Sequence, residues 1–420
     1  MQAVLGIAVL LGIAWLCSED RRAVDRRLLV VGVALQFAIA ALLVHVPPLR
    51  TAVLSLNVVV QAVDAATAQA TGFLFGHLAG GPAPFEVTNP ANLEVIAFRV
   101  IPQILVFSVL VALGWYWRVL PFLIRILGAG LRRTLGVGGA VGLGAAASIF
   151  VGMVEAPMAV RPLLARLDRG ELFVLLTCGM ATVAGTVMLL YATILEPVLP
   201  GSLGHILSAS VISAPAAIVV GALMVPSGPG TETDDFEGPA RYGSLMDAVA
   251  RGTSDGVRLV ASVVAMLLVF LALVALVNQV LGALPIVAGE PLTLERILGW
   301  FFSPLAWLVG VPWPEAGTAG SLLGTKLVLN EFIAYLQLAA LDPAALSERS
   351  RLVLTYALCG FANLPSLGIL VGGLLAMVPE RRDEVLALAP RSLLSGTLAT
   401  LLTGAVIGLV TAGGGGGGLQ

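Results

Sequence analysis

The sequence predicts an all-α integral membrane protein with eight transmembrane helices and two opposed re-entrant helical hairpins. Three observations carry this prediction: the composition, the placement of basic residues and an internal repeat. Of the 420 residues, 58% are hydrophobic and only 11% are charged. A water-soluble domain cannot bury that much apolar surface, whereas a lipid bilayer accepts it. The formal net charge of −2 also argues against nucleic acid as a partner.

Eight apolar stretches approach the length that crosses a hydrocarbon core, which takes roughly 20 helical residues. The arginines at 21–27 follow the first stretch and place that loop in the cytoplasm, with the N-terminus outside. Residues 54–75 predict a helix that lies along the interface or on the scaffold. The predicted spans are 1–17, 28–45, 94–117, 171–198, 203–226, 254–281, 352–378 and 389–411.

Two further apolar segments predict the hairpins. The segment 135–160 has arginines on both flanks, so both of its ends belong on the cytoplasmic side. Such a segment enters the membrane and turns back, and Pro157 and nearby glycines permit the break. The alternative is that this segment crosses the membrane once, against the tendency of basic residues to lie on the cytoplasmic side. The second segment, 319–341, contains Lys326, Asn330 and Glu331 and is expected to enter from the outside.

An internal repeat supports the two opposed hairpins. The motif CGMATVAGT at 178–186 matches CGFANLPSL at 359–367, and each follows a glutamate-bearing hairpin. Units of similar sequence and opposite orientation form an inverted repeat, which in transporters places the substrate at the midplane. Polar residues at the repeat centres are costly in hydrocarbon unless they face a partner or water. They are Ser148, Glu155, Thr182, Asn330, Glu331, Asn363 and Ser366.

The spans and hairpins divide the chain into six parts. We expect scaffold helices with an interfacial helix, a first transport repeat with its hairpin at 135–165, a cytoplasmic linker, a scaffold helix, a second transport repeat with its hairpin at 316–342, and a flexible glycine-rich tail. The respective ranges are 1–117, 118–226, 227–253, 254–284, 285–412 and 413–420.

The hairpin motifs together resemble the concentrative nucleoside transporter family. The resemblance covers roughly residues 95–410 and depends on a G-x-x-E-A-P hairpin, the segment NEFIAY and the segment CGFAN. It implies eight spans, two opposed hairpins, a homotrimer and inward nucleoside transport by an elevator-like movement. Sodium is the usual coupling ion of the family, and no cofactor is expected. The implied location is the cell (inner) membrane.

The resemblance also implies roles for individual residues. Glu155 would face the nucleobase, near Met153, Val154 and Val187, whereas Glu331, Asn363 and Ser366 would hold the ribose and Phe361 would pack against the ligand. Oxygens of four residues would bind sodium, several of them from the backbone: Ser148, Val151, Thr182 and Val183.

This chain departs from the family pattern on the base side and at the cation site. Met153 and Val154 replace an amide and a hydroxyl, and Ser148 replaces an asparagine. Two alternatives therefore stay open: coupling to protons, and a modified nucleoside or related heterocycle as substrate. A structural ion pair of the glutamates with Lys326 or Arg161 is a further alternative.

Other classes of function fit the sequence poorly. An intramembrane enzyme needs a nucleophile with a nearby base or a metal cluster, and the scattered histidines and cysteines provide neither. A channel does not require paired opposed hairpins. We therefore expect a secondary transporter and not an enzyme.

Overall fold

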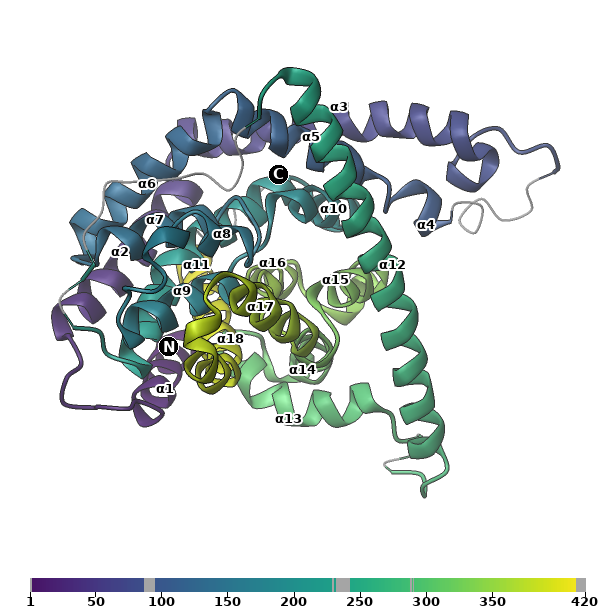
Figure 1. Cartoon of the computed structure of the whole chain (residues 1–420). Coiled ribbons are helices and arrows are strands. Elements are labelled where there is room, and N and C mark those ends of the chain that lie inside the picture. Colours follow the sequence, from purple (N-terminus) through teal and green to yellow (C-terminus); the bar gives the residue numbers. More distant parts are fainter. Residues whose placement is uncertain are drawn as a thin grey trace.

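The computed structural model describes residues 2–86, 95–228, 230–231, 242–287, 289 and 291–412. All the secondary-structure elements formed by these residues are helices (Figure 1). The predicted tail at 413–420 and part of the predicted linker, 232–241, lie outside the described residues. Among the described residues, six helical stretches are long and apolar enough to cross a membrane, or seven if the bent pair Leu294–Leu308 and Trp313–Val328 is one span. The six are Arg26–His45, Ile96–Tyr116, Arg169–Leu195, Ser202–Met224, Leu245–Gly282 and Pro379–Thr411.

The N-terminal part contains three helices and two capping devices. The carboxylate of Asp25 accepts the backbone N–H groups of Arg27 and Leu28 and so begins the second helix. The third helix is longer than the predicted 54–75, because Pro47 fits the first turn, where its missing N–H costs nothing. The elements are α1 (Gln2–Leu16), α2 (Arg26–His45), α3 (Pro47–Phe75) and the short η1 (Gly76–Ala79).

Two long helices, α5 and α6, precede the first predicted hairpin. A capping box begins α9, since Asp168 accepts the N–H of Glu171 while the Glu171 side chain accepts the N–H of Asp168. The elements are α4 (Ile96–Arg99), α5 (Gln103–Tyr116), α6 (Val119–Leu135), α7 (Gly139–Ser148), α8 (Glu155–Met158), η3 (Arg161–Leu163), α9 (Arg169–Ala181), α10 (Gly185–Leu195) and α11 (Ser202–Met224).

The second repeat follows the long helix α12. Helix α13 was not predicted, and it meets α14 at a bend of 117°. The elements are α12 (Leu245–Gly282), α13 (Leu294–Leu308), α14 (Trp313–Val328), α15 (Glu331–Ala340), η4 (Pro343–Ala345), α16 (Glu348–Leu358), α17 (Leu364–Met377), η5 (Pro379–Arg381) and α18 (Arg382–Ala412).

Two predicted continuous spans are broken. The stretch 171–198 divides at 182–184, and the stretch 352–378 divides at 359–363. The two copies of the repeated Cys-Gly motif lie at these two breaks. The hairpins divide at 149–154 and at 329–330. Pro157 therefore lies inside α8 and not at the first break, which contains Gly152 instead.

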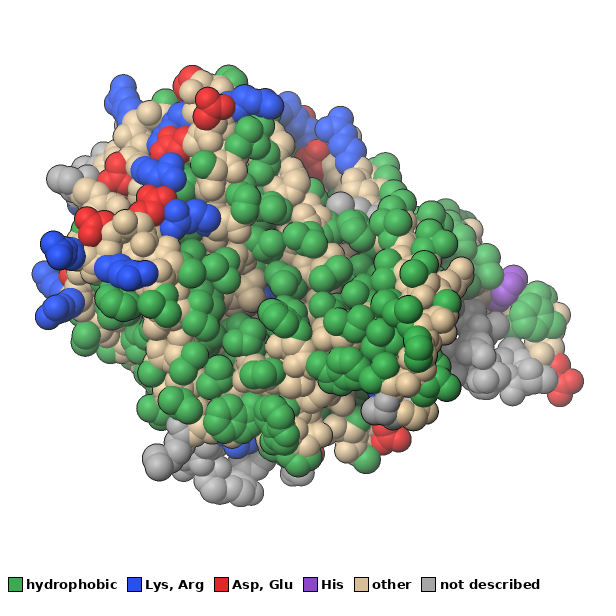
Figure 2. Space-filling model, turned by 90° about the horizontal axis from the view of Figure 1, so that it is seen from below, with side chains coloured by type: hydrophobic (Ala, Val, Ile, Leu, Met, Phe, Trp, Pro, Cys, Tyr) green, Lys and Arg blue, Asp and Glu red, His purple; other side chains and the backbone are tan. Residues whose placement is uncertain are grey.

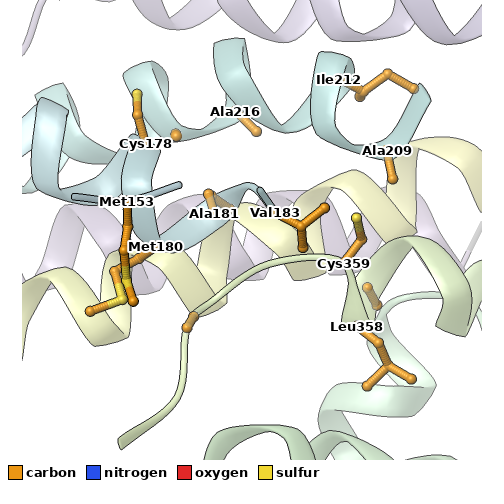
Figure 3. Packing of buried hydrophobic residues seen from close by; sticks show 14 of the residues in the cluster. Met153, Cys178, Met180, Ala181, Val183, Ala209, Ile212, Ala216, Leu358 and Cys359 are labelled. Carbon is orange, nitrogen blue, oxygen red and sulfur yellow. The ribbon is translucent and has the colours of Figure 1, made fainter. Parts of the chain in front are cut away.

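The two broken spans pass close to each other. The backbone N–H of Phe361 donates to the Thr182 carbonyl over 3.2 Å, which joins the two breaks directly. A Cβ on Gly360 would lie 2.9 Å from the carbonyl oxygen of Ala181, so this approach requires glycine. In the close-up of Figure 3, Val183 of the first break is seen next to Cys359 of the second.

The helices form a buried centre and an exposed flank. Helices α9, α11 and α18 pack against one another, and α16 packs on α18. Helix α12 instead runs along one side of the molecule (Figure 1), and none of its most apolar window is buried. Figure 2 shows a broad surface of hydrophobic side chains, with most of the visible charged side chains gathered at one margin. An apolar surface of this extent matches contact with lipid or with another apolar surface.

The packing groups the first two helices with the buried centre. Helix α2 packs on α11 and α18, and α1 packs on α18 and α13, whereas α5 packs along α12. Glu19, in the loop after α1, accepts hydrogen bonds from Arg169 at 2.9 Å and Arg391 at 2.6 Å. The helices of the predicted unit 1–117 thus contact two different parts of the protein.

Candidate functional site

A cavity of about 200 Å³ lies where the two predicted hairpin segments and both broken spans meet. Its wall includes residues from the first hairpin, α10, the second hairpin, the break at 359–363, α17 and α12. Residues up to about 200 positions apart in the chain therefore share one site. All eight side chains predicted to contact a substrate line this cavity: Met153, Val154, Glu155, Val187, Glu331, Phe361, Asn363 and Ser366.

Glu331 is the most constrained of these side chains. It is buried, with 3% of its surface exposed. One carboxylate oxygen accepts a hydrogen bond from the Tyr191 hydroxyl at 2.6 Å, and the other accepts one from the Asn363 side-chain amide at 2.8 Å. Each carboxylate oxygen can accept more than one bond, so the group can still receive hydroxyl donors from a ligand.

Two asparagines place the helix starts at the cavity. Asn330 accepts the N–H of Ile333 and begins α15, and Asn363 accepts the N–H of Ser366 and begins α17. The two residues are N-caps at corresponding points of the second hairpin and the second broken span. The positive ends of two helices therefore border a cavity that contains carboxylates, which favours polar or anionic groups there.

Glu155 has very different surroundings. Its side chain is exposed, and no side chain in the described part of the chain donates a hydrogen bond to it or forms an ion pair with it. Met153, Val154 and Val187 supply an apolar wall beside it. A Cβ on Gly152 would overlap with Glu155 Oε2, so glycine at this position leaves room for the carboxylate. Glu155 also borders a second cavity of about 470 Å³ between the first hairpin, α5 and α12.

Neither proposed structural ion pair forms among the described residues. Lys326 donates to the Ala357 carbonyl and to the Thr400 hydroxyl, and the two oxygens of Glu331 have other partners. Arg161 lies in η3 with its side chain exposed. The two glutamates thus remain available to a ligand.

Several lining residues were not predicted. Tyr191 holds Glu331, Thr186 and Phe332 border the ligand space, and Leu259 and Val263 of α12 close one side. A tyrosine within an apolar span is a weak signal for Tyr191, since its hydroxyl needs a partner in hydrocarbon. The residues of α12 give no signal, because a cavity-facing leucine and a lipid-facing leucine look alike in the sequence.

The four predicted sodium ligands lie at two neighbouring helix ends. Ser148 ends α7, Val151 follows it, and Thr182 and Val183 follow α9. The N–H of Gly185 donates to the Phe150 carbonyl at 2.9 Å, which joins the two segments. All four residues are buried.

The donor set at these ends fits a hard cation. The Ser148 hydroxyl donates to the Ala145 carbonyl and the Thr182 hydroxyl donates to the Cys178 carbonyl, so the lone pairs of both oxygens stay available. Carbonyl and hydroxyl oxygens at the negative ends of two helices are suitable ligands for a hard cation such as sodium.

Family models cover most of the chain. The model described as Na⁺ dependent nucleoside transporter N-terminus matches residues 5–78, and the corresponding C-terminus model matches residues 205–408. Between them, a model described as nucleoside recognition matches residues 97–198, which include the first hairpin.

Curated relatives match over nearly the full length. The chain is 37% identical to an uncharacterized transporter, YutK, of Bacillus subtilis, covering 97% of this chain and 98% of the relative. It is 35% identical to the nucleoside permease NupC of Helicobacter pylori, with 97% of each chain covered. Sodium/nucleoside cotransporter 2 of Rattus norvegicus is 31% identical over 96% of this chain and 62% of its own length.

Solved structures match as closely. The chain is 39% identical to a protein called CNTnw in an inward-facing substrate-bound state, with a TM-score of 0.89 and coverage of 98% of this chain and 97% of that one. A doubly substituted form of CNTnw in an outward-facing state matches with the same identity and coverage and a TM-score of 0.87.

Proposed function

Because this chain belongs to the family of Na⁺-dependent nucleoside transporters, a multi-pass membrane family, we propose that it imports nucleosides across the cell membrane by sodium symport. The predicted family resemblance is thereby confirmed. The observation that carries the proposal is the cavity in which Glu331, held by Tyr191 and Asn363, lies together with Glu155.

The Glu331 side of the cavity is proposed to hold the ribose. A ribose carries adjacent hydroxyl groups, which donate to carboxylate oxygens and accept from amide and backbone N–H groups. Glu331, Asn363 and Ser366 supply these groups within a few ångströms of one another, since Asn363 bonds to both of the other residues. Buried, fixed polar groups discriminate strongly against ligands that leave them unpaired.

The Glu155 side is proposed to face the nucleobase. Here one carboxylate is surrounded by Met153, Val154 and Val187, which have no strong hydrogen-bonding groups in their side chains. A base with several polar edge groups would leave some of them unpaired on this side. The proposal therefore includes weak discrimination among bases, or a preference for a modified base or a related heterocycle.

Sodium is proposed to bind at the ends of α7 and α9, through oxygens of Ser148, Val151, Thr182 and Val183. The support is the oxygen-rich, buried pair of helix ends described above. Because the break at 182–184 bonds to the break at 359–363 through Phe361, an ion there would stabilise the arrangement of the ligand cavity. Binding of the ion and of the nucleoside would then be coupled.

Transport is proposed to occur by an elevator movement. The moving unit would contain both hairpins, α9–α11 and α16–α18. The sequence-based prediction assigns α1 and α2 to the scaffold, but because these two helices pack on α11 and α18, we propose instead that they belong to the moving unit. Helices α5 and α12 would form the stationary part, and the exposed apolar face of α12 is suited to contacts in a homotrimer. The hairpins would be re-entrant, and the N-terminus would lie outside.

Thermal stabilisation tests the proposal directly. The purified protein is melted with a panel of purine and pyrimidine nucleosides, free bases and ribose, in sodium and in choline buffers. A ligand that binds only the folded state raises the melting temperature. We expect nucleosides to stabilise and free bases not to, with a larger effect in sodium. A panel in which no nucleoside raises the melting temperature in either salt would contradict the proposal.

A further inference from the structure

Lys326 is the only lysine in the chain, whose other 22 basic residues are all arginines. It lies in the last turn of α14, next to the break of the second hairpin. Only 2% of its surface is exposed. A single buried ammonium group in the membrane interior is costly, so its retention requires an explanation.

The contacts of Lys326 are to uncharged oxygens. Its ammonium donates to the Ala357 carbonyl at 3.2 Å and to the Thr400 hydroxyl at 2.7 Å. Ala357 lies in the last turn of α16, whose final carbonyls lack partners within the helix. Among the described residues, no carboxylate lies within 4.0 Å of the ammonium group. The lysine is therefore ligated in the way that a hard cation is, by carbonyl and hydroxyl oxygens.

The surroundings of Lys326 resemble the proposed sodium site of the first repeat in the kind of helix ends that meet there. In the first repeat, the ends of the hairpin helix α7 and of the broken-span helix α9 come together. In the second repeat, the ends that meet are those of α14, which carries Lys326, and of α16, which accepts its hydrogen bond. Both places combine the negative ends of a hairpin helix and a broken-span helix.

The two pairs of helix ends differ in which group binds their terminal carbonyl oxygens. In the second repeat the protein supplies its own cation. In the first repeat, no side chain in the described part of the chain donates to the carbonyls of residues 179–181, and position 182 contributes a hydroxyl. The carbonyl groups at the end of α16 therefore already have a cationic partner, whereas those at the end of α9 can still bind an ion.

We propose that Lys326 is a covalently attached counterpart of the coupling ion, which occupies in the second repeat the place that sodium takes in the first. This inference rests on the proposed sodium-coupled function. It adds that the second repeat contains a cation site closed to external ions, and that the protein moves one sodium ion with each nucleoside.

The charges at the two hairpin breaks support a ratio of one. Three charged side chains of the two hairpins lie at or next to their breaks: Glu155, Glu331 and Lys326. Two carboxylates and one ammonium carry a formal charge of −1, which a single sodium ion neutralises. A ligand site without net charge moves through the low-dielectric interior at much lower cost than a charged one. Without the lysine the formal charge would be −2, and two cations would be needed.

The choice of lysine over arginine fits the same role. An ammonium group is a compact point charge with donors in three directions, whereas a guanidinium is a planar fork suited to carboxylates and phosphates. A site with the shape of a small ion accepts the first and not the second. All other Lys/Arg positions of this chain are arginine, so we attribute the lysine at 326 to the size and shape of its binding site.

The test compares the sodium dependence of the wild-type protein with that of Lys326→Met, which replaces the side chain by an unbranched apolar one that is one atom shorter and carries no charge. Full-length protein with uridine is melted over a series of sodium concentrations, with choline holding the ionic strength constant. The slope of stability against the logarithm of sodium concentration reports the number of ions bound. We expect a slope of about one ion for the wild type and about two for Lys326→Met.

Arg351→Met provides the matched control. Arg351 is also a buried cation on α16, and its guanidinium donates to the carbonyls of Leu346 and Asp342, but it lies at the opposite end of that helix. Its replacement is expected to lower the melting temperature without changing the sodium slope. An equal increase of the slope in both variants would overturn the assignment, because it would reflect general loss of charge.

Two further outcomes have distinct meanings. If the wild type binds uridine with sodium dependence and Lys326→Met keeps a slope of one, the inference on Lys326 is wrong and the proposed function stands. If wild-type binding shows no dependence on sodium, the proposed sodium coupling itself is wrong.

The coupling ratio of the wild type provides a measurement that does not depend on the folding of a variant. In proteoliposomes, the membrane potential at which net uridine flux stops, under known sodium and uridine gradients, gives the number of sodium ions per nucleoside. A ratio of one supports the proposal. A ratio of two would overturn it.

Discussion

Replacing Glu331 by glutamine is the most informative perturbation of the site. In the wild type, one carboxylate oxygen accepts from Tyr191 at 2.6 Å and the other accepts from Asn363 at 2.8 Å. Glutamine has one oxygen and one NH₂ group. If the glutamine oxygen accepts from Asn363, its NH₂ group faces the Tyr191 hydroxyl, which then can no longer donate to position 331. In the other orientation the NH₂ group faces the amide donor of Asn363, and two donors oppose each other.

The magnitude follows from the hydrogen bonds that are lost. A hydrogen bond to a charged group contributes about 1.5–3 kcal/mol, and a glutamine keeps only part of that contribution. If one such bond to the ribose is lost, the dissociation constant rises by roughly 10-fold to 150-fold. Because ribose is common to all nucleosides, the loss should be nearly the same for purine and pyrimidine nucleosides.

The assay is thermal stabilisation by a concentration series of uridine, cytidine, adenosine and guanosine, which yields relative affinities through the shift in melting temperature. Glu155→Gln is the matched control, since it makes the same chemical change on the other side of the cavity and should alter the ranking of bases. Equal changes of selectivity in the two variants would refute the assignment of ribose to Glu331.

Three other predictions concern the first hairpin, the cation site and the ionic contact outside the membrane. Gly152→Ala should abolish nucleoside binding while the fold persists, because the new Cβ overlaps with Glu155, and ligand-induced stabilisation measures this. Thr182→Val removes one hydroxyl oxygen and should raise the sodium concentration for half-maximal uptake severalfold, with uridine affinity at saturating sodium unchanged. Hydrogen bonds from Arg169 lower the pKa of Glu19, so Glu19→Gln should reduce stability by up to about 1 kcal/mol near pH 7.

The sign of the Glu19 effect sets its pH range. A lowered pKa in the folded state means that the contribution to stability is present above the ordinary carboxyl pKa and is lost as the pH falls through the folded value. The melting temperatures of wild type and Glu19→Gln should therefore converge in acid, and a constant difference at all pH values would contradict the ionic role of Glu19.

The control for Gly152→Ala is Gly130→Ala. Gly130 lies inside α6, and no heavy atom lies within 4 Å of an added Cβ. Alanine there should leave uridine binding unchanged, since it also favours the helix. Loss of binding in both variants would show that the change at Gly152 acts through the fold and not through Glu155.

The apolar helices and both glutamates were predicted from the sequence. Membrane-spanning segments have a strongly apolar composition, and a carboxylate within such a segment is rare and easily recognised. The break at 182–184 was not predicted. This segment contains no proline, its Thr182 carbonyl accepts from Phe361, and the adjoining Gly185 N–H donates to Phe150, both partners being distant in the chain. Such a break depends on tertiary contacts, which a local pattern does not contain.

The same reason explains what was missed in the site. Tyr191 holds Glu331 across 140 positions of sequence, and the residues of α12 face the cavity only because of how that helix is placed. The unpredicted helix α13 contains Pro304, which argues against a helix in the sequence, although extensive packing on α14 stabilises it. Residues with their own chemical signal were predicted, and residues that depend on placement were not.

The most direct test of the proposed function is uptake of radiolabelled uridine into proteoliposomes under an imposed sodium gradient. Three conditions are compared: an inward sodium gradient, an inward proton gradient without sodium, and no gradient. The proposal predicts that uridine accumulates above its external concentration only with the sodium gradient. Accumulation driven by the proton gradient alone, or mere equilibration in all three conditions, would contradict it.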